Sequence, residues 1–153
     1  MVPEAHNPYF AAALEGIGNV LEDENLMLLL CNTRKDQERE EKILRMLNQQ
    51  RLKGLIITPA ADDTDAKETN RYKKCLEALN IPIIFMDSAV DLCQWDIVYF
   101  DNFMSSYNLV RGMLTNGCRD LGIMTGNLST KTARDRYKGY TRALEEFENL
   151  TRM

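Results

Sequence analysis

The sequence predicts a doubly wound α/β domain built on a parallel sheet. Short, continuous apolar runs alternate with longer stretches whose apolar residues recur at helical spacing. Such runs are typical of strands that are buried on both faces, and strands separated by helices pair in parallel through right-handed crossovers. A length of 153 residues and an apolar fraction of 44% suffice for one ordinary domain with a sizeable core.

The first half of the chain predicts two helices and two strands. Apolar residues at helical spacing indicate a helix over residues 8–22, and the apolar run 26–31 indicates a buried strand. Residues 36–50 are charged but keep apolar side chains on one side, which is typical of a surface helix. The next strand covers 55–58, and Pro59 ends it.

The middle of the chain departs once from this alternation. We predict a helix over 66–79 and strands over 82–86 and 96–100. The segment 87–94 joins these two strands without a helix between them. A change of sheet direction or of lobe is therefore expected near this segment.

The last third predicts helix, strand and helix. A helix runs from about Met104 to Asn116-Gly117, a pair that suits a helix C-cap. Residues 121–124 are expected to form the last strand, and 133–148 the final helix. The sequence from Thr132 to Asp135 has the form of a capping box, which places Thr132 at the N-cap.

Composition excludes several classes of function. The net charge of −4 argues against a broad basic surface that grips nucleic acid. Four scattered cysteines and one histidine offer no zinc ligand set, so we expect free thiols, no metal and no cofactor. No Gly-rich phosphate loop and no Ser-His-Asp arrangement is present, so no catalytic residue is predicted. No signal peptide or membrane span is visible, and a cytoplasmic location without membrane contact is expected.

Polar residues follow the predicted strands, where parallel sheets bind their ligands. Asp87 follows one strand, Asp101-Asn102 another, and a hydroxyl-rich loop over 125–132 the last. Arg136 lies beside that loop, and an arginine with hydroxyls and carboxylates suits a sugar or another polyhydroxylated or planar ligand. Each residue has a structural alternative: Asp101 and Thr132 as helix caps, and Arg136 as a solvated helix residue.

Two adjacent aromatic residues open the first predicted helix. One of Tyr9 and Phe10 must belong to the core, and the other is free to lie at the mouth of a cleft. An aromatic face is a familiar apolar contact for a sugar ring.

An ordered series of motifs resembles the effector-binding core of LacI/GalR-family transcription repressors. Any one piece is weak, but the ordered series spans essentially the whole chain. One departure is Cys118, where the family usually has histidine, and this position is interpreted as structural. The series comprises Asn7 to Phe10, Arg51 to Pro59, Asp101-Asn102, Gly117 to Gly126, and Thr132 to Tyr140.

The resemblance implies a two-lobed fold of the periplasmic binding protein-like I type, with the ligand between the lobes. Residues 1–101 would form the N-terminal lobe, with most of its first strand missing, and 102–153 part of the C-terminal lobe. The family's helix-turn-helix DNA-binding domain is absent, so the chain is expected to be a fragment of a longer regulator. The implied ligand contacts are Tyr9, Phe10 and Asp87 from the first lobe and Thr130, Thr132 and Arg136 from the second.

The implied function is that of a sensor in a repressor. A sugar or nucleobase-like effector would control DNA binding by the absent head domain. We also expect a homodimer or strand exchange, because the helix over 133–148 has an apolar face that needs a partner. Two alternatives remain: a solute-binding protein of a sugar transporter, and a flavodoxin-like enzyme or receiver domain, which the absence of a suitably placed lysine disfavours.

Overall fold

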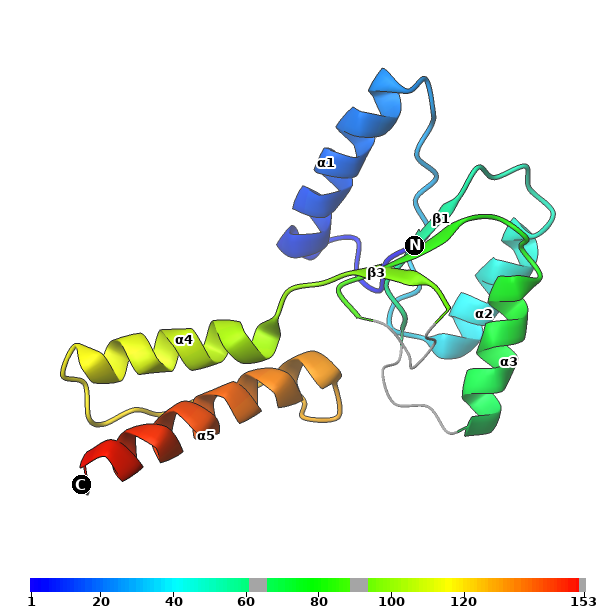
Figure 1. Cartoon of the computed structure of the whole chain (residues 1–153). Coiled ribbons are helices and arrows are strands. Elements are labelled where there is room, and N and C mark those ends of the chain that lie inside the picture. The colour runs from blue at the N-terminus through cyan, green and yellow to red at the C-terminus, as the bar shows by residue number, and fades with distance from the viewer. Residues whose placement is uncertain (61–65, 89–93, 152–153) are drawn as a thin grey trace. The chain divides into compact units, whose positions relative to one another are not determined.

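The computed structural model describes residues 1–60, 66–88 and 94–151 (Figure 1). The chain divides into two compact units, Met1–Val98 and Tyr99–Met153, and each has its own helices and its own core. The sequence placed this boundary three residues later, between 101 and 102. Within the described ranges, no helix is both long enough and apolar enough to span a membrane.

A three-stranded parallel sheet lies at the centre of the first unit. Its strands are β1 (Leu55–Ile57), β2 (Ile83–Met86) and β3 (Asp96–Val98), in the order β1-β2-β3. The parallel α/β fold that the sequence predicts is therefore confirmed. A change of sheet direction or of lobe was expected near residues 87–94. The change of direction is wrong, because β2 and β3 also pair in parallel, whereas the boundary between the two units lies directly after β3.

Helices cover both faces of this sheet, as a doubly wound fold requires (Figure 1). One face carries α2 (Gln37–Leu47) and α3 (Ala66–Glu77), and the other carries α1 (Pro8–Asp23). Alternate strand residues point to opposite faces, which divides the core in two. The larger part comprises Met1, Leu44, Leu47, Leu55, Ile57, Tyr72, Leu76, Leu79, Ile83 and Phe85, and the smaller is built on Val2, Phe10 and Met86.

Local sequence signals set where these helices begin. The Asn7 side chain accepts a hydrogen bond from the Tyr9 N–H at 3.0 Å, and Pro8 occupies the first turn of α1. The Asp36 carboxylate accepts from the Arg39 N–H at 2.9 Å and caps α2. Helices are therefore observed at 8–23, 37–47 and 66–77, close to the predicted ranges.

The strand predicted over 26–31 does not form. Met27 is 97% exposed and Leu29 57% exposed. The only ladder contacts at the end of this run are the Val2 N–H to the Cys31 carbonyl and the Thr33 N–H to the Val2 carbonyl. An apolar segment forms a strand only where a neighbouring strand offers a full row of hydrogen bonds to its backbone. Among the described residues, this segment has only the two hydrogen bonds to Val2.

Two helices that run in the same direction make up the core of the second unit. They are α4 (Asn102–Thr115) and α5 (Lys131–Thr151). The predicted cap pair follows α4, with Asn116 as the C-cap and Gly117 at a φ of 94°. The helices cross closely at Gly139, where an added Cβ would overlap the Phe103 carbonyl oxygen. Beyond the crossing, Val110, Leu114 and Ala143 form the buried core, with Tyr140, Leu144 and Phe147 packed against it.

This packing changes the basis of one expectation. The apolar face of the final helix was expected to need a second chain, but α4 of the same chain covers most of it. Tyr137 is the member of that face that stays exposed. A homodimer therefore has no support from this helix face.

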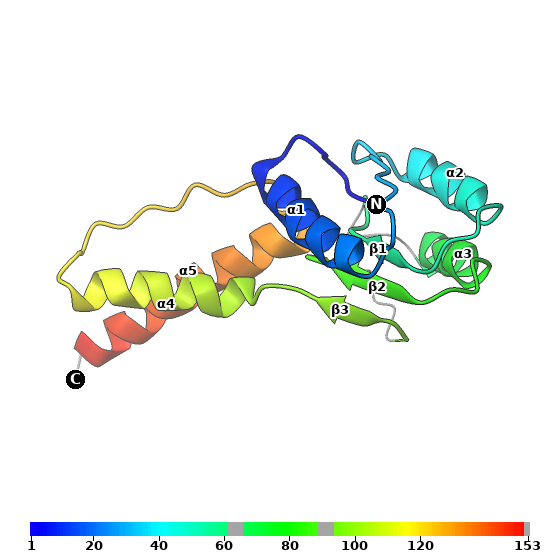
Figure 2. The ribbon, with the colours of Figure 1, turned by 90° about the horizontal axis from the view of Figure 1, so that it is seen from above.

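The strand predicted over 121–124 does not form either. Figure 2 shows this segment as part of a single extended trace that runs back from the end of α4 to the start of α5. Ile123 is 36% and Met124 99% exposed. The physical reason is the same as for residues 26–31, because no strand of the described second unit lies beside the segment to pair with it.

Candidate ligand-binding residues in the two units

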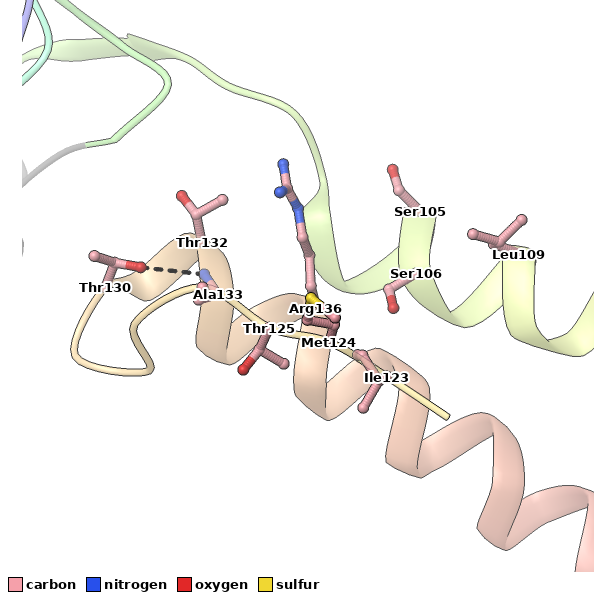
Figure 3. A pocket seen from close by; sticks show the side chains of 11 residues that line it. Ser105, Ser106, Leu109, Ile123, Met124, Thr125, Thr130, Thr132, Ala133 and Arg136 are labelled. Carbon is pink, nitrogen blue, oxygen red and sulfur yellow. Dashed lines mark hydrogen bonds between the residues drawn. The ribbon is translucent and has the colours of Figure 1, made fainter. Parts of the chain in front are cut away.

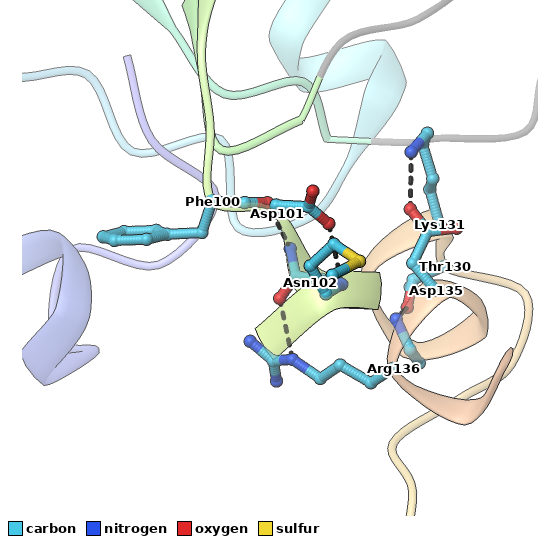
Figure 4. A network of polar contacts seen from close by, with 9 residues as sticks. Phe100, Asp101, Asn102, Thr130, Lys131, Asp135 and Arg136 are labelled. Atoms are coloured by element: carbon cyan, nitrogen blue, oxygen red, sulfur yellow. Dashed lines mark hydrogen bonds and ion pairs between the residues drawn. The ribbon is translucent and has the colours of Figure 1, made fainter. Parts of the chain in front are cut away.

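Arg136 in the second unit is held by Asn102, which sequence spacing alone could not reveal. The Arg136 Nε donates a hydrogen bond to Asn102 Oδ1 at 2.8 Å, across 34 positions of the chain (Figure 4). The Asn102 side chain is 9% exposed, and its Nδ2 donates to the Phe100 carbonyl at 3.1 Å. This second bond fixes the amide orientation, so that its oxygen faces the guanidinium.

A cavity of about 430 Å³ lies beside this arginine (Figure 3). Its walls come from the first half of α4, the extended segment before α5, and the first turns of α5. The lining residues are Ser105, Ser106, Leu109, Ile123, Met124, Thr125, Gly126, Thr130, Thr132, Ala133 and Arg136. The structure thus brings three sequence-predicted residues together: Thr130, Thr132 and Arg136.

The helix caps at this site correct one prediction and settle one alternative. Thr130, and not Thr132, is the N-cap of α5, because the helix begins at Lys131 and the Ala133 N–H donates to Thr130 Oγ1 at 3.4 Å. Thr132 therefore lies inside the first turn. Asp101 caps α4, since its carboxylate accepts from the Met104 N–H at 2.8 Å.

In the first unit, Tyr9 and Asp87 lie together. Burial raises the pKa of Tyr9 above its usual value, and the charge and hydrogen bonding of the Asp87 carboxylate raise it further. Tyr9 is 37% exposed and packs edge-on against Phe10, with the ring centroids 5.0 Å apart. Phe10 is 5% exposed and belongs to the core. Of the two aromatic residues, Phe10 is therefore the core residue and Tyr9 is the one at the surface.

The backbone at Asp87 is unusual for a residue with a side chain. Its φ is 67°, and the Ser88 N–H bonds back to the Met86 carbonyl at 2.8 Å, which closes a γ-turn of the strained kind. The Thr58 hydroxyl donates to the same carbonyl at 2.8 Å. Strained turns concentrate at sites of function, and this turn lies where β2 ends and fixes where the Asp87 carboxylate is presented.

Sequence reasoning missed part of the cavity wall. Ser105 follows Asn102 by three residues and so lies one helical turn further along α4, a spacing that could have identified it. The apolar part of the wall, formed by Leu109, Ile123 and Met124, could not be predicted in this way, because apolar residues in a sequence are interpreted as core residues.

The described residues include no group of three or more His, Cys, Asp or Glu side chains placed to hold a metal ion. Cys31, Cys75 and Cys118 are free thiols, and Cys93 lies outside the described residues.

Comparison with known proteins gives one consistent result. The family model for periplasmic binding proteins and the sugar binding domain of the LacI family matches residues 1–150. The HTH-type transcriptional repressor PurR of Aliivibrio salmonicida is 29% identical over 151 residues, which are 99% of this chain and 44% of the repressor. The chain thus spans less than half the length of this relative.

Solved structures share the fold. The transcription regulator GntR from Chromobacterium violaceum matches with a TM-score of 0.79 and 25% identity, over 96% of this chain and 52% of that one. An ABC transporter periplasmic solute binding protein from Actinobacillus succinogenes with bound D-allose matches with a TM-score of 0.77 and 18% identity, over 95% and 54%. The chain belongs to the family of periplasmic binding proteins and sugar-binding domains of LacI-type regulators.

Proposed function

We propose that this chain is the effector-sensing part of a LacI-type transcription repressor and binds a sugar or a similar small polar ligand. The observation that carries the proposal is the setting of Arg136. Asn102 engages its Nε, and within the described residues neither Nη group has a hydrogen-bonding partner. A guanidinium fixed at one edge and open at the other, beside a hydroxyl-lined cavity, is suited to hold oxygen atoms of a ligand.

The first unit would contribute Tyr9 and Asp87. The carboxylate accepts hydrogen bonds from ligand hydroxyl or amine groups, and the half-exposed Tyr9 ring offers an apolar face to a sugar ring. Phe10 would act from beneath, by fixing the Tyr9 ring through their edge-on contact. Thr132 and Arg136 would contribute from the second unit, with Thr130 setting the start of α5.

The protein would sense its ligand because the ligand binds one arrangement of the two units more tightly than another. A ligand held by residues of both units binds most tightly to one arrangement of them and shifts the population toward it. In a repressor, that shift would be coupled to DNA affinity through a helix-turn-helix domain and a homodimer. Such a protein is cytoplasmic and is not an enzyme. The HTH-type repressor relative supports this function.

A solute-binding protein of a sugar transporter is the second candidate. The fold shared with the transporter protein that holds D-allose favours it, although at 18% identity that likeness concerns the fold alone. The two functions differ in a single measurable property, since only a repressor changes its affinity for DNA when the ligand binds.

Thermal unfolding of the full-length natural protein with a panel of sugars and purines tests ligand binding. A ligand at 100 times its Kd is expected to stabilise the protein by about 2.7 kcal/mol. Arg136→Ala should abolish most of that shift, whereas Arg142→Ala should keep it, because Arg142 is paired with Glu146 on the same helix and does not line the cavity. An unchanged shift in Arg136→Ala would remove this residue from the site.

The same ligand then distinguishes the two functions. DNA affinity measured with and without it should change at least tenfold for a repressor, which corresponds to about 1.4 kcal/mol of coupling. A ligand that binds without any effect on DNA affinity favours the transporter function.

A further inference from the structure

We propose that Thr58 is a positioning residue in the first unit, and that its hydroxyl holds the peptide group that directs the Asp87 carboxylate toward Tyr9. This inference rests on the proposed function, in which Asp87 and Tyr9 bind the ligand, and it adds a buried residue behind them.

The peptide group between Met86 and Asp87 is the first observation, because three hydrogen bonds hold it. Its carbonyl oxygen accepts from the Thr58 hydroxyl and from the Ser88 N–H, each at 2.8 Å. Its N–H donates to the Val98 carbonyl, also at 2.8 Å. Both lone pairs of the oxygen and the one hydrogen are therefore used, so this peptide plane is fixed from the end of β1 and from β3.

Thr58 supplies the one bond of these three that comes from a side chain. The other two join backbone groups, and they can form with any residue that has a backbone N–H. The amino acid at position 58 therefore decides whether the third bond exists. Valine has nearly the same shape as threonine and no hydroxyl group, so a valine variant removes the hydrogen bond with little change in volume.

Burial and stiffness set the direction of the Thr58 hydroxyl. The residue is 3% exposed, and its own N–H donates to the Met1 carbonyl at 3.1 Å, which fixes its backbone. Threonine is branched at Cβ, so few side-chain rotamers are open to it. A hydrogen bond that is kept from water is also electrostatically stronger than one at the surface.

The conformation of Asp87 needs such support. Its φ of 67° lies in the left-handed region, which a residue with a side chain enters only at a cost in energy. The direction of its Cα–Cβ bond follows from this φ and from the plane of the preceding peptide group. If that plane were free to rotate, Asp87 would relax toward negative φ and its carboxylate would move away from Tyr9. The bond from Thr58 opposes this rotation.

Titration of Tyr9 reports the position of Asp87 without any ligand. Burial raises the pKa of Tyr9, and the charge and hydrogen bonding of the Asp87 carboxylate raise it further. Ring-carbon NMR of the full-length natural protein with labelled tyrosine follows this titration, and Tyr9→Phe assigns the signal. Thr58→Val should lower the pKa of Tyr9 by roughly half or more of the decrease that Asp87→Asn causes.

Further variants show whether the hydroxyl is responsible. Thr58→Ser keeps a hydroxyl group and should restore most of the wild-type pKa of Tyr9. Thr33→Val is the matched control, because Thr33 is 0% exposed and its hydroxyl donates to another backbone carbonyl of the first unit, that of Val2, at 3.4 Å. This control should leave the pKa of Tyr9 unchanged. Thr58→Ala gives the same test where the valine variant does not fold.

Three results would overturn the proposal: a wild-type pKa of Tyr9 in Thr58→Val, an equal decrease in Thr33→Val, or no recovery in Thr58→Ser. The titration uses no ligand, so none of these results bears on whether the protein senses one. If the titration gives the expected result and no sugar or purine stabilises the protein, Thr58 positions Asp87 and only the sensing function is contradicted.

Discussion

The two units of the chain bury apolar residues by different means. In the first unit, strand side chains such as Ile57 and Phe85 are fully buried between the sheet and its helices. In the second, two helices that run in the same direction bury each other, while the apolar segment over 121–124 runs unpaired with Met124 almost fully exposed. The difference shows that an apolar run becomes a strand through its neighbours, since composition is similar in both places.

The units differ also in the charge that they bury, and this gives the largest expected effect. Glu40 in α2 is 1% exposed, and its carboxylate accepts from the Ala60 N–H at 2.8 Å. Burial raises the pKa of Glu40 to about 7, against hydrogen bonds that lower it. The second unit buries only the neutral Asn102 among the polar residues described.

A raised pKa in the folded state means that the protonated form is favoured by folding. The stability from Glu40 is present below its unfolded pKa of about 4.5 and is lost as the pH rises through about 7. We expect the loss to reach about 3 kcal/mol by pH 8. Glu40→Gln should therefore stabilise the first unit at pH 8 and change little at pH 4.5, as measured by urea unfolding across this range.

The difference between wild type and variant isolates Glu40 from the other buried groups. These include Tyr72, whose pKa burial raises, and the Met1 amine, whose pKa burial lowers. A variant that follows the wild-type pH profile in parallel would show that Glu40 stays ionised in the folded state.

Helix crossing in the second unit gives the next effect. Gly139→Ala should destabilise the helix pair by about 1–3 kcal/mol, because the new methyl group overlaps the Phe103 carbonyl oxygen and meets the Tyr107 backbone nitrogen at 2.9 Å. Gly112→Ala in α4 is the control, since nothing lies within 4 Å of its added Cβ. That change should stabilise the helix by up to about 1 kcal/mol. Equal effects of the two variants in thermal unfolding would contradict the close crossing.

The smallest effect distinguishes two neighbouring threonines. Thr130→Ala should cost about 1 kcal/mol, because it removes the N-cap of α5, whereas Thr132→Ala should cost only a few tenths. Hydrogen exchange of the first-turn amides of α5 measures both. If Thr132→Ala exposes these amides more than Thr130→Ala, the helix begins where the sequence pattern placed it.

The strands over 55–57 and 83–86 could be predicted from sequence because their neighbours are supplied by the same chain. That the apolar runs over 26–31 and 121–124 form no strand could not be predicted, because an apolar pattern indicates a preference for burial and does not show whether a neighbouring strand is available for pairing. At the site, the position of Asp87 followed from the end of its strand and that of Arg136 from the family resemblance, whereas the sequence pattern placed the N-cap of the last helix at Thr132 and not at Thr130. The Asn102–Arg136 bond joins residues 34 apart and leaves no local pattern.

Calorimetric titration of the full-length natural protein with its ligand tests the central proposal, that Asp87 and Arg136 both take part in ligand binding. Asp87→Asn removes the charge and keeps a side chain that tolerates the positive φ, and Arg136→Gln removes the guanidinium. Each should weaken binding at least tenfold, about 1.4 kcal/mol, while Arg142→Gln leaves it unchanged. Unaltered affinity in Asp87→Asn or in Arg136→Gln would contradict the proposal.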